Sequence, residues 1–386
     1  MAKYKAKEFN LRYLRYMKQK LLEIKRLGHM LMLLGMAFCI GGTITAQDIH
    51  FTNFRMAPLS INPALTGAFE GTYRVSAIYR DQWTPIDNSR PFKTPFVSGE
   101  FNMLGGVLLD HDWVSGGISF QRDQAGSLNM KNQMTALNVG YHIGMDKDYS
   151  RVFSFGVTYG SMNRGIDLMG ITPEAVENTI TGGIPVATQI PGVSGGPGEA
   201  QQSISFTTLS VGVAYKTQLE SGGLIRFGLN AGHINNPDAS IFKIGGGGID
   251  SMGGVPIVRE KDGFGPKIVL HGEGSFVMNE KVRLNPALIF QSQNGFRELA
   301  VQTTADYMLN REKQMVAIGG LGYRLGDAVE LMGGVQIKDL RVMLSYDLTT
   351  SSLTQAGGGA FELAVGYVGR IYRTPQVKPV IFCPRL

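Results

Sequence analysis

The chain is poor in cysteine and has no long apolar run after its first 46 residues. Only two of its 386 residues are cysteine, Cys39 and Cys383. If the segment that holds Cys39 is removed on export, no intrachain disulfide can form. Past residue 46 no apolar run reaches the roughly 18 residues that mark a membrane-spanning helix. A mature chain that enters a membrane must therefore cross it with strands.

The main part of the chain also lacks an excess of charge of either sign. The sequence contains 37 Lys and Arg and 31 Asp and Glu, and residues 1–46 carry nine of the basic and two of the acidic ones. The remaining 28 basic and 29 acidic residues nearly balance. A nucleic-acid-binding protein keeps its positive charge on the folded domain. We therefore set nucleic-acid binding aside.

The basic excess belongs to a segment with the features of an export signal. The basic stretch Lys3–Arg26 precedes the apolar run Leu31–Ile40, and small residues lead to Ala46. This order is typical of a secretory signal, and an apolar run of about ten residues is too short for a spanning helix. We expect a signal peptide over 1–46, with cleavage after Ala46. Phe38 disfavours a lipoprotein signal, because such signals need a small residue there.

From Gly71 onward, apolar and polar side chains alternate with a period of two. Between Glu298 and Tyr307, for example, Leu299 and Val301 share one face, whereas Ala300 and Gln302 share the other. Such alternation gives a strand one apolar and one polar face. The charged residues predicted on the inner, polar face are Glu298, Asp306, Glu330, Arg341 and Glu362. We expect them to be solvated or paired inside a barrel.

The length and number of these segments favour a membrane barrel over a soluble sheet. They are about ten residues long, as a tilted membrane-crossing strand requires, and tyrosines stand near their ends, where an interfacial girdle would lie. Fourteen can be counted, an even number that lets a sheet close. We predict an all-β fold, a transmembrane antiparallel up-and-down β-barrel over 71–369. Segment 47–70 would fold at or in its periplasmic mouth, and 370–386 would form a periplasmic tail.

The loop lengths agree with this topology. The two long connections, 162–205 and 233–266, follow the fifth and seventh predicted strands, whereas turns after even-numbered strands, such as 278–281, are short. Long loops on one side only are typical of outer-membrane barrels. Both long connections are rich in Gly, Pro, Ser and Thr, and loops of this length are usually functional or disordered. Their apolar side chains are our candidates for partner binding: Ile180, Ile184, Ile190, Ile249 and Met252.

Several strings along the mature chain resemble the PorP/SprF family of type IX secretion proteins. They are Gln47–Phe54, Asn62–Gly67 (Asn-Pro-Ala-Leu-Thr-Gly), Tyr79–Trp83, Gly232–Pro237, Ser345–Ser352 with Gly359–Glu362, and the tail Phe382–Leu386. No single string is specific, but their order is. The 162–205 connection is longer than we expect for the family. The residues to which we assign structural roles from these strings are Asn62, Pro63, Gly67, Trp83, His233, Pro237, Tyr346, Asp347 and Glu362.

The resemblance implies a cell outer-membrane barrel in contact with membrane lipids. It would bind a specific secreted protein through that protein's C-terminal domain, work with type IX secretion components, and help to export or surface-anchor cargo such as gliding adhesins. Two alternatives stay open: a passive porin or hydrophobic-solute transporter, and a surface enzyme with a serine nucleophile. For segment 47–70, docking of a periplasmic partner is an alternative to a purely structural role.

Little in the sequence points to catalysis, a cofactor or a metal. No two of the six histidines share a metal-ligand spacing with a nearby carboxylate or cysteine. The Gly-rich stretch 245–254 lacks the Lys and Ser or Thr that complete a phosphate-binding P-loop. No feature singles out one serine as a nucleophile. We therefore expect no enzyme activity, no cofactor and no metal site.

Overall fold

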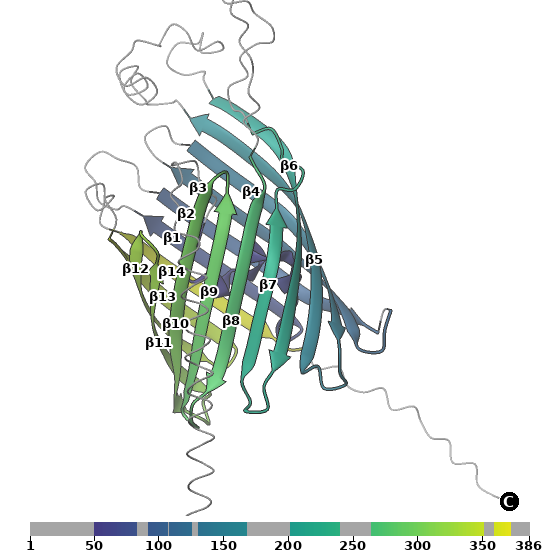
Figure 1. Cartoon of the computed structure of the whole chain (residues 1–386). Helices are drawn as coiled ribbons and strands as arrows, with labels where there is room; N and C mark the ends of the chain where they lie inside the picture. The colour runs from purple at the N-terminus through teal and green to yellow at the C-terminus, as the bar shows by residue number, and fades with distance from the viewer. Residues whose placement is uncertain are drawn as a thin grey trace, which may run out of the picture. The chain divides into compact units, whose positions relative to one another are not determined.

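A closed barrel of fourteen antiparallel strands forms the body of the chain (Figure 1). The computed structural model describes residues 50–82, 92–106, 108–125, 130–167, 201–239, 264–350 and 359–371. Each strand pairs with its neighbours in the sequence, and β1 pairs with β14 over their whole length. The up-and-down barrel predicted from the sequence is thus confirmed.

The strand bounds follow the alternating pattern closely. The strands are β1 (Tyr73–Gln82), β2 (Phe92–Gly105), β3 (Asp112–Ala125), β4 (Met130–Gly144), β5 (Arg151–Asp167), β6 (Gln201–Gln218), β7 (Leu224–Gly232), β8 (Lys267–Val277), β9 (Val282–Gln293), β10 (Phe296–Asn310), β11 (Met315–Arg324), β12 (Ala328–Ile337), β13 (Leu340–Thr349) and β14 (Ala360–Gly369). Odd-numbered strands run from the short-turn end to the long-loop end. In an outer-membrane barrel these ends face the periplasm and the cell exterior respectively.

The two faces of each strand meet different surroundings, as the alternation predicts. Outward side chains such as Val75, Leu137, Phe227 and Leu344 are exposed and apolar, which suits contact with lipid. Tyrosines that point outward form two rows. One row lies near the periplasmic ends of the strands (Tyr73, Tyr215, Tyr307, Tyr367), and the other lies toward the outer ends (Tyr79, Tyr159, Tyr323, Tyr346). These rows bound the apolar belt as interfacial girdles do.

The sequence-based bounds were wrong for the pair β5 and β6, which both extend further outward than we expected. The predicted connection 162–205 begins only after Asp167 and ends before Gln201. Above Tyr159 the outward side chains are polar, for example Ser161 and Asn163, and polar outward positions are not typical of a membrane strand. The extension was therefore mistaken for a loop. Its polar surface indicates that it lies outside the lipid.

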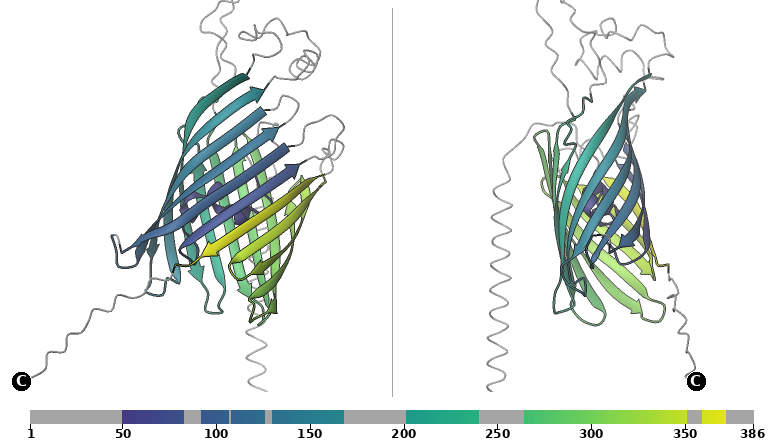
Figure 2. Two further views of the ribbon diagram at one scale, coloured as in Figure 1. Left: turned by 180° about the vertical axis from the view of Figure 1, so that it is seen from behind. Right: turned by 90° about the vertical axis from the view of Figure 1, so that its right-hand side faces the viewer.

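Three short helical turns lie inside the barrel: η1 (Phe54–Met56), α2 (Pro58–Ile61) and η2 (Pro63–Leu65). Figures 1 and 2 show them enclosed by the strands at mid-height. Among the described residues no helix is both long and apolar enough to span a membrane. We refer to residues 50–72 as the plug.

Candidate functional site

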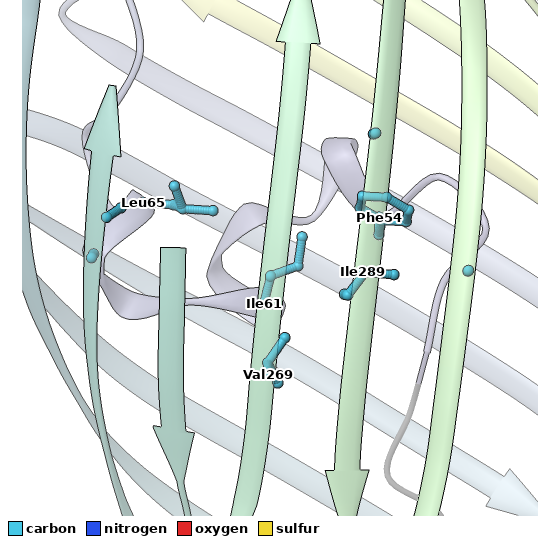
Figure 3. Close-up of a cluster of buried hydrophobic side chains, with 9 residues drawn as sticks. Phe54, Ile61, Leu65, Val269 and Ile289 are labelled. Atoms are coloured by element: carbon cyan, nitrogen blue, oxygen red, sulfur yellow. The ribbon is translucent and has the colours of Figure 1, made fainter. Parts of the chain in front are cut away.

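Apolar side chains of the plug complete a hydrophobic core with the inner face of the barrel. Figure 3 shows Ile61 beside Val269 of β8 and Phe54 beside Ile289 of β9, whereas Leu65 lies further along the plug, and all five are buried members of one cluster. A second cluster holds Phe51 and Ala57 against inward side chains of β1, β2 and β11 to β14. Burying one such side chain contributes about 1.5–3 kcal/mol. The plug is therefore packed into the lumen as a core element.

A buried carboxylate holds the outer end of the plug. Glu362 of β14 accepts hydrogen bonds from the backbone N–H groups of Thr52 (3.0 Å) and Asn53 (2.7 Å) and from Asn53 Nδ2 (2.8 Å). Glu362 has no exposed surface. A hydrogen bond to a charged group is stronger than a neutral one. This contact fixes the point at which the plug begins its path down the lumen.

Two buried arginines connect this anchor to the surrounding strands. Arg80 Nη2 lies 2.9 Å from Asp347 Oδ2, and its Nη1 lies 3.0 Å from Thr52 Oγ1. Arg324 Nη2 lies 2.8 Å from Glu330 Oε1 and 3.2 Å from Asp347 Oδ2. Removing one partner from such a buried network leaves a charge without compensation, which costs about 3–5 kcal/mol. The network therefore ties the plug to β1, β11, β12 and β13 together.

The middle of the plug is held by Asn62, the first residue of the Asn-Pro-Ala string. Its Oδ1 accepts the N–H of Ala64 at 2.9 Å and caps η2. Its Nδ2 lies 3.0 Å from the carbonyl oxygen of Val213, 3.2 Å from that of Leu229 and 3.0 Å from His271 Nε2. Asn62 and Pro63 are fully buried. One amide thus joins the plug to strands β6, β7 and β8.

Glycines of the wall make room for this stretch of backbone. A Cβ added at Gly156 would overlap Pro63, and a Cβ at Gly212 would overlap Asn62 Oδ1. At the end of the same string, Gly67 has a φ of +72° and donates its N–H to Glu100 Oε2 at 2.8 Å. A side chain at Gly67 would collide with Ser115. The string is therefore fitted to the inner wall by its shape and by its hydrogen bonds.

Ser115 and His142 lie close together but are not arranged for nucleophilic catalysis. His142 Nε2 is 2.7 Å from the carbonyl oxygen of Thr66, which can only accept, so Nε2 carries the proton. Ser115 Oγ is 2.6 Å from the same carbonyl and is fully buried. His142 Nδ1 pairs with Ser154 Oγ at 2.8 Å. An Nε2 that carries a proton cannot accept one from Ser115, so the group holds the plug backbone instead.

Among the cavities bounded by described residues, the larger ones lie toward the periplasmic end. A cavity of about 450 Å³ is bounded by the plug residues Leu65 to Glu70, by Trp113, and by Tyr149 in a short turn. A second cavity, of about 230 Å³, is bounded partly by Arg55 and Arg226, which share Glu273 at 3.0 and 2.7 Å. On the outer side of the plug, the cavities beside Arg324 measure only about 20 and 10 Å³. The plug thus leaves a vestibule that faces the periplasm.

The string Gly232–Pro237 lies at the outer end of β7, where His233 is buried. The His233 ring makes an edge contact with Phe264, at 4.6 Å between centroids, and its Nδ1 bonds to Thr208 Oγ1. Both His233 (φ +53°) and Asn236 (φ +40°) have left-handed backbone conformations. With Pro237 next in the chain, this string ends the strand and turns the backbone away from the wall.

The structure brings some of the predicted site residues together and separates others. Asp347 and Glu362 meet in the buried network, Asn62, Pro63 and Gly67 hold the plug, and Tyr346 points outward toward lipid. Trp83 and all five loop candidates, Ile180, Ile184, Ile190, Ile249 and Met252, lie outside the described residues, as do 1–49 and 372–386. Among the described residues no group of His, Cys, Asp and Glu could hold a metal ion.

Sequence reasoning missed Arg80, Glu100, Arg324 and Asn53. The first three occupy inward positions on their strands, so counting alternate residues would have placed them in the lumen. No local signal identifies Asn53, because its partners are distant in the chain. The plug also reaches further than the periplasmic mouth that we predicted, since Thr52 contacts strand ends on the exterior side.

Comparison with known proteins gives one family match. A model described as "Type IX secretion system membrane protein PorP/SprF" matches residues 43–367. No curated protein matches the chain in sequence.

Several solved barrels are similar to the chain at low identity. The translocator domain of the autotransporter NalP from Neisseria meningitidis is 10% identical, with 81% of this chain and 93% of that chain covered and a TM-score of 0.38. The CymD monoaromatic hydrocarbon channel is 10% identical, with coverage of 86% and 95% and a TM-score of 0.48. The Pseudomonas putida toluene transporter TodX is 10% identical, with coverage of 84% and 95% and a TM-score of 0.46. Similarity this distant says nothing about what the present chain binds.

Replacing Asn62 by alanine should loosen the plug. The change leaves the Ala64 N–H without its cap and removes the amide that joins three strands, so we expect the free energy of unfolding to fall by about 2 kcal/mol. Urea unfolding in detergent micelles measures this loss. The matched control is Asn163→Ala, which removes an exposed amide and should cost less than about 0.5 kcal/mol. Equal effects of the two changes would contradict the role of Asn62.

Replacing Glu362 by glutamine should destabilise the outer anchor. An amide cannot compensate Arg80, and its NH2 group replaces one of the two oxygens and must face a donor of either Thr52 or Asn53, so we expect a loss of about 3 kcal/mol. Limited proteolysis should then cleave within residues 50–70, which we expect to resist cleavage in the unaltered barrel. Glu280→Gln is the control, because that side chain is 86% exposed beside Arg311 and its loss should change stability little. A Glu362→Gln barrel as stable and resistant as this control would count against the anchor.

Proposed function

The chain belongs to the PorP/SprF family of type IX secretion system membrane proteins, and on this basis we propose that it is a carrier whose outer face binds a specific secreted protein. In this proposal the plugged outer-membrane barrel helps to export that protein or to anchor it at the cell surface. The secreted partner would be recognised through its C-terminal domain, and a gliding adhesin is the kind of cargo we expect. The barrel performs no catalysis in this role.

The plug is the main observation in support of the proposal. Its contacts with Glu362, Val213 and Glu100 run along most of the lumen and occupy space through which a solute would pass. A porin depends on an open aqueous lumen. The passive porin and the hydrophobic-solute transporter are therefore the weaker alternatives, because each requires displacement of a packed and hydrogen-bonded segment.

The uneven outer rim of the barrel gives further support. The strands β5 and β6 continue beyond the lipid belt, and the two longest connections, 168–200 and 233–266, follow β5 and β7 on this side of the wall. Those connections contain Ile180, Ile184, Ile190, Ile249 and Met252, which we propose as apolar partner contacts. Loops on a rigid scaffold are common places for recognition.

The proposal predicts that the tagged barrel, expressed in its own host, co-purifies in mild detergent with one secreted protein. Deleting 170–200 should leave an inserted barrel and abolish surface display of that protein, because part of the outer surface is lost. Surface labelling measures display, and mobility with and without heating measures insertion. A barrel that captures no secreted protein would overturn the proposal. If surface display is retained after the deletion, the connection 168–200 does not bind the secreted protein.

Conductance in planar bilayers separates the carrier from a porin. We expect the unaltered barrel to be silent, and Gly156→Leu to conduct, because a side chain there displaces Pro63 and the plug from the wall. Gly319→Leu is the matched control: Gly319 has no neighbour within 4 Å of an added Cβ, so this variant should stay silent. Solute-dependent currents through the unaltered barrel would favour a porin instead.

A further inference from the structure

The barrel wall has a step between β6 and β7 on the exterior side. Strand β6 pairs with β5 along its whole length, from Gln201 to Thr217. Its pairing with β7 begins only at Val211, which faces Ala231. Figure 1 shows β6 rising above the end of β7. Over residues 201–210, no described strand therefore pairs with the side of β6 that faces away from β5.

The string after β7 creates this step. Ile234 donates its N–H to the carbonyl oxygen of Leu209. The Asn235 side chain accepts the N–H of Leu209 at 3.0 Å and donates to the carbonyl oxygen of Thr207 at 2.7 Å. The side-chain amide of Asn235 thus supplies the hydrogen bonds that a neighbouring strand would make to Leu209 and Thr207. The left-handed Asn236 and then Pro237 prevent β7 from continuing further.

The direction of the backbone groups above Thr207 follows from these contacts. In a strand the N–H and C=O of one residue point to the same side, and the side alternates from residue to residue. Leu209 and Thr207 face away from β5. The register between β5 and β6 is unbroken, so Ser205 and Ser203 also present their N–H and C=O groups away from β5.

This edge lies outside the lipid belt, and its own residues lack the charges and proline that protect natural edges. The outward side chains of Ser203, Ser205 and Thr207 are exposed and polar. On the inner face, Ile204 and Phe206 are only partly buried. Native proteins block unpaired edges with charged side chains, proline or bulges. The sequence from Ser203 to Val213 contains no charged residue and no proline.

We propose that the edge of β6 at 203–207 receives an extended segment of the secreted partner as an added strand. This inference rests on the proposed carrier function and names the surface that would perform it. Main-chain hydrogen bonds to Ser203 and Ser205 supply binding, and alternate side chains supply specificity, as in other strand-addition sites. The added segment has apolar residues toward Ile204 and Phe206 and polar residues outward.

Residue-resolved amide hydrogen exchange tests the proposal on the purified full-length barrel. In the isolated protein the N–H groups of Ser203 and Ser205 should exchange freely, whereas those of Ile204 and Phe206, which face β5, should be protected. Adding the co-purified secreted protein should slow exchange at Ser203 and Ser205 by tenfold or more. Protection of these two amides in the isolated barrel, or no change when the partner is bound, would overturn the proposal.

A pair of substitutions at one position gives an independent test. Ser205→Pro removes the edge N–H without removing a bond to β5, and proline is tolerated on edge strands. We expect it to weaken partner binding at least tenfold. Ser205→Ala keeps the N–H and should bind within twofold of the unaltered barrel. Equal binding by the two variants would overturn the proposal. A dimer in detergent that Ser205→Pro dissociates would also overturn it, because the edge would then join two copies of this chain.

These outcomes remain distinct from failure of the carrier function. If the unaltered barrel captures no secreted protein, the proposed function itself is wrong. If it captures a secreted protein, but Ser205→Pro leaves binding unchanged and hydrogen exchange at Ser203 and Ser205 is not slowed by the partner, only the strand-addition site is wrong. Ser203→Pro serves as a second variant should Ser205→Pro fail to insert.

Discussion

The structure depends on one constraint: polar groups that are buried inside a closed barrel need hydrogen-bond or ion-pair partners. Closure removes the sheet edges that lipid could not satisfy, but it also turns one face of every strand into an interior. In this chain that interior contains Arg80, Arg324 and several carboxylates, which cannot remain buried without compensation. The plug meets this need from within the same polypeptide. Its backbone N–H groups and the side chains of Thr52 and Asn53 complete the network around Asp347 and Glu362.

The same interior is divided into two different halves. Toward the exterior, charge pairs and apolar packing around Phe51 leave only small cavities between the described residues. Toward the periplasm, the vestibule beside Arg226 stays open. In the proposed function such a barrel is closed to passive diffusion, and its partners contact it at its two ends. The outer end is the one at which the wall is uneven, and it is there that a family of secretion proteins would meet a secreted partner.

The sequence predicts the wall far better than the contents of the lumen. Alternation over residues such as Glu298 to Tyr307 identifies each strand and its inward face, because lipid and interior impose opposite polarity on neighbouring residues. The rule fails for the parts of β5 and β6 beyond Tyr159, because the outward side chains there, such as Ser161 and Asn163, are polar and exposed and no longer contact lipid. The contacts of the plug with the barrel wall could not be predicted from the sequence either. The contacts of Asn53 and Asn62 with the barrel wall join residues that are 151 to 309 positions apart, and no local sequence pattern predicts them.

The central claim is that residues 51–67 are a fixed part of the barrel interior. Amide hydrogen exchange on the isolated barrel in micelles tests it directly. The N–H groups of Thr52, Asn53, Ala64 and Gly67 have partners within the lumen, so we expect them to exchange as slowly as those of the strands. If they exchange as fast as the amides of the short turns, the segment is not held in place, and the closed barrel described above is contradicted.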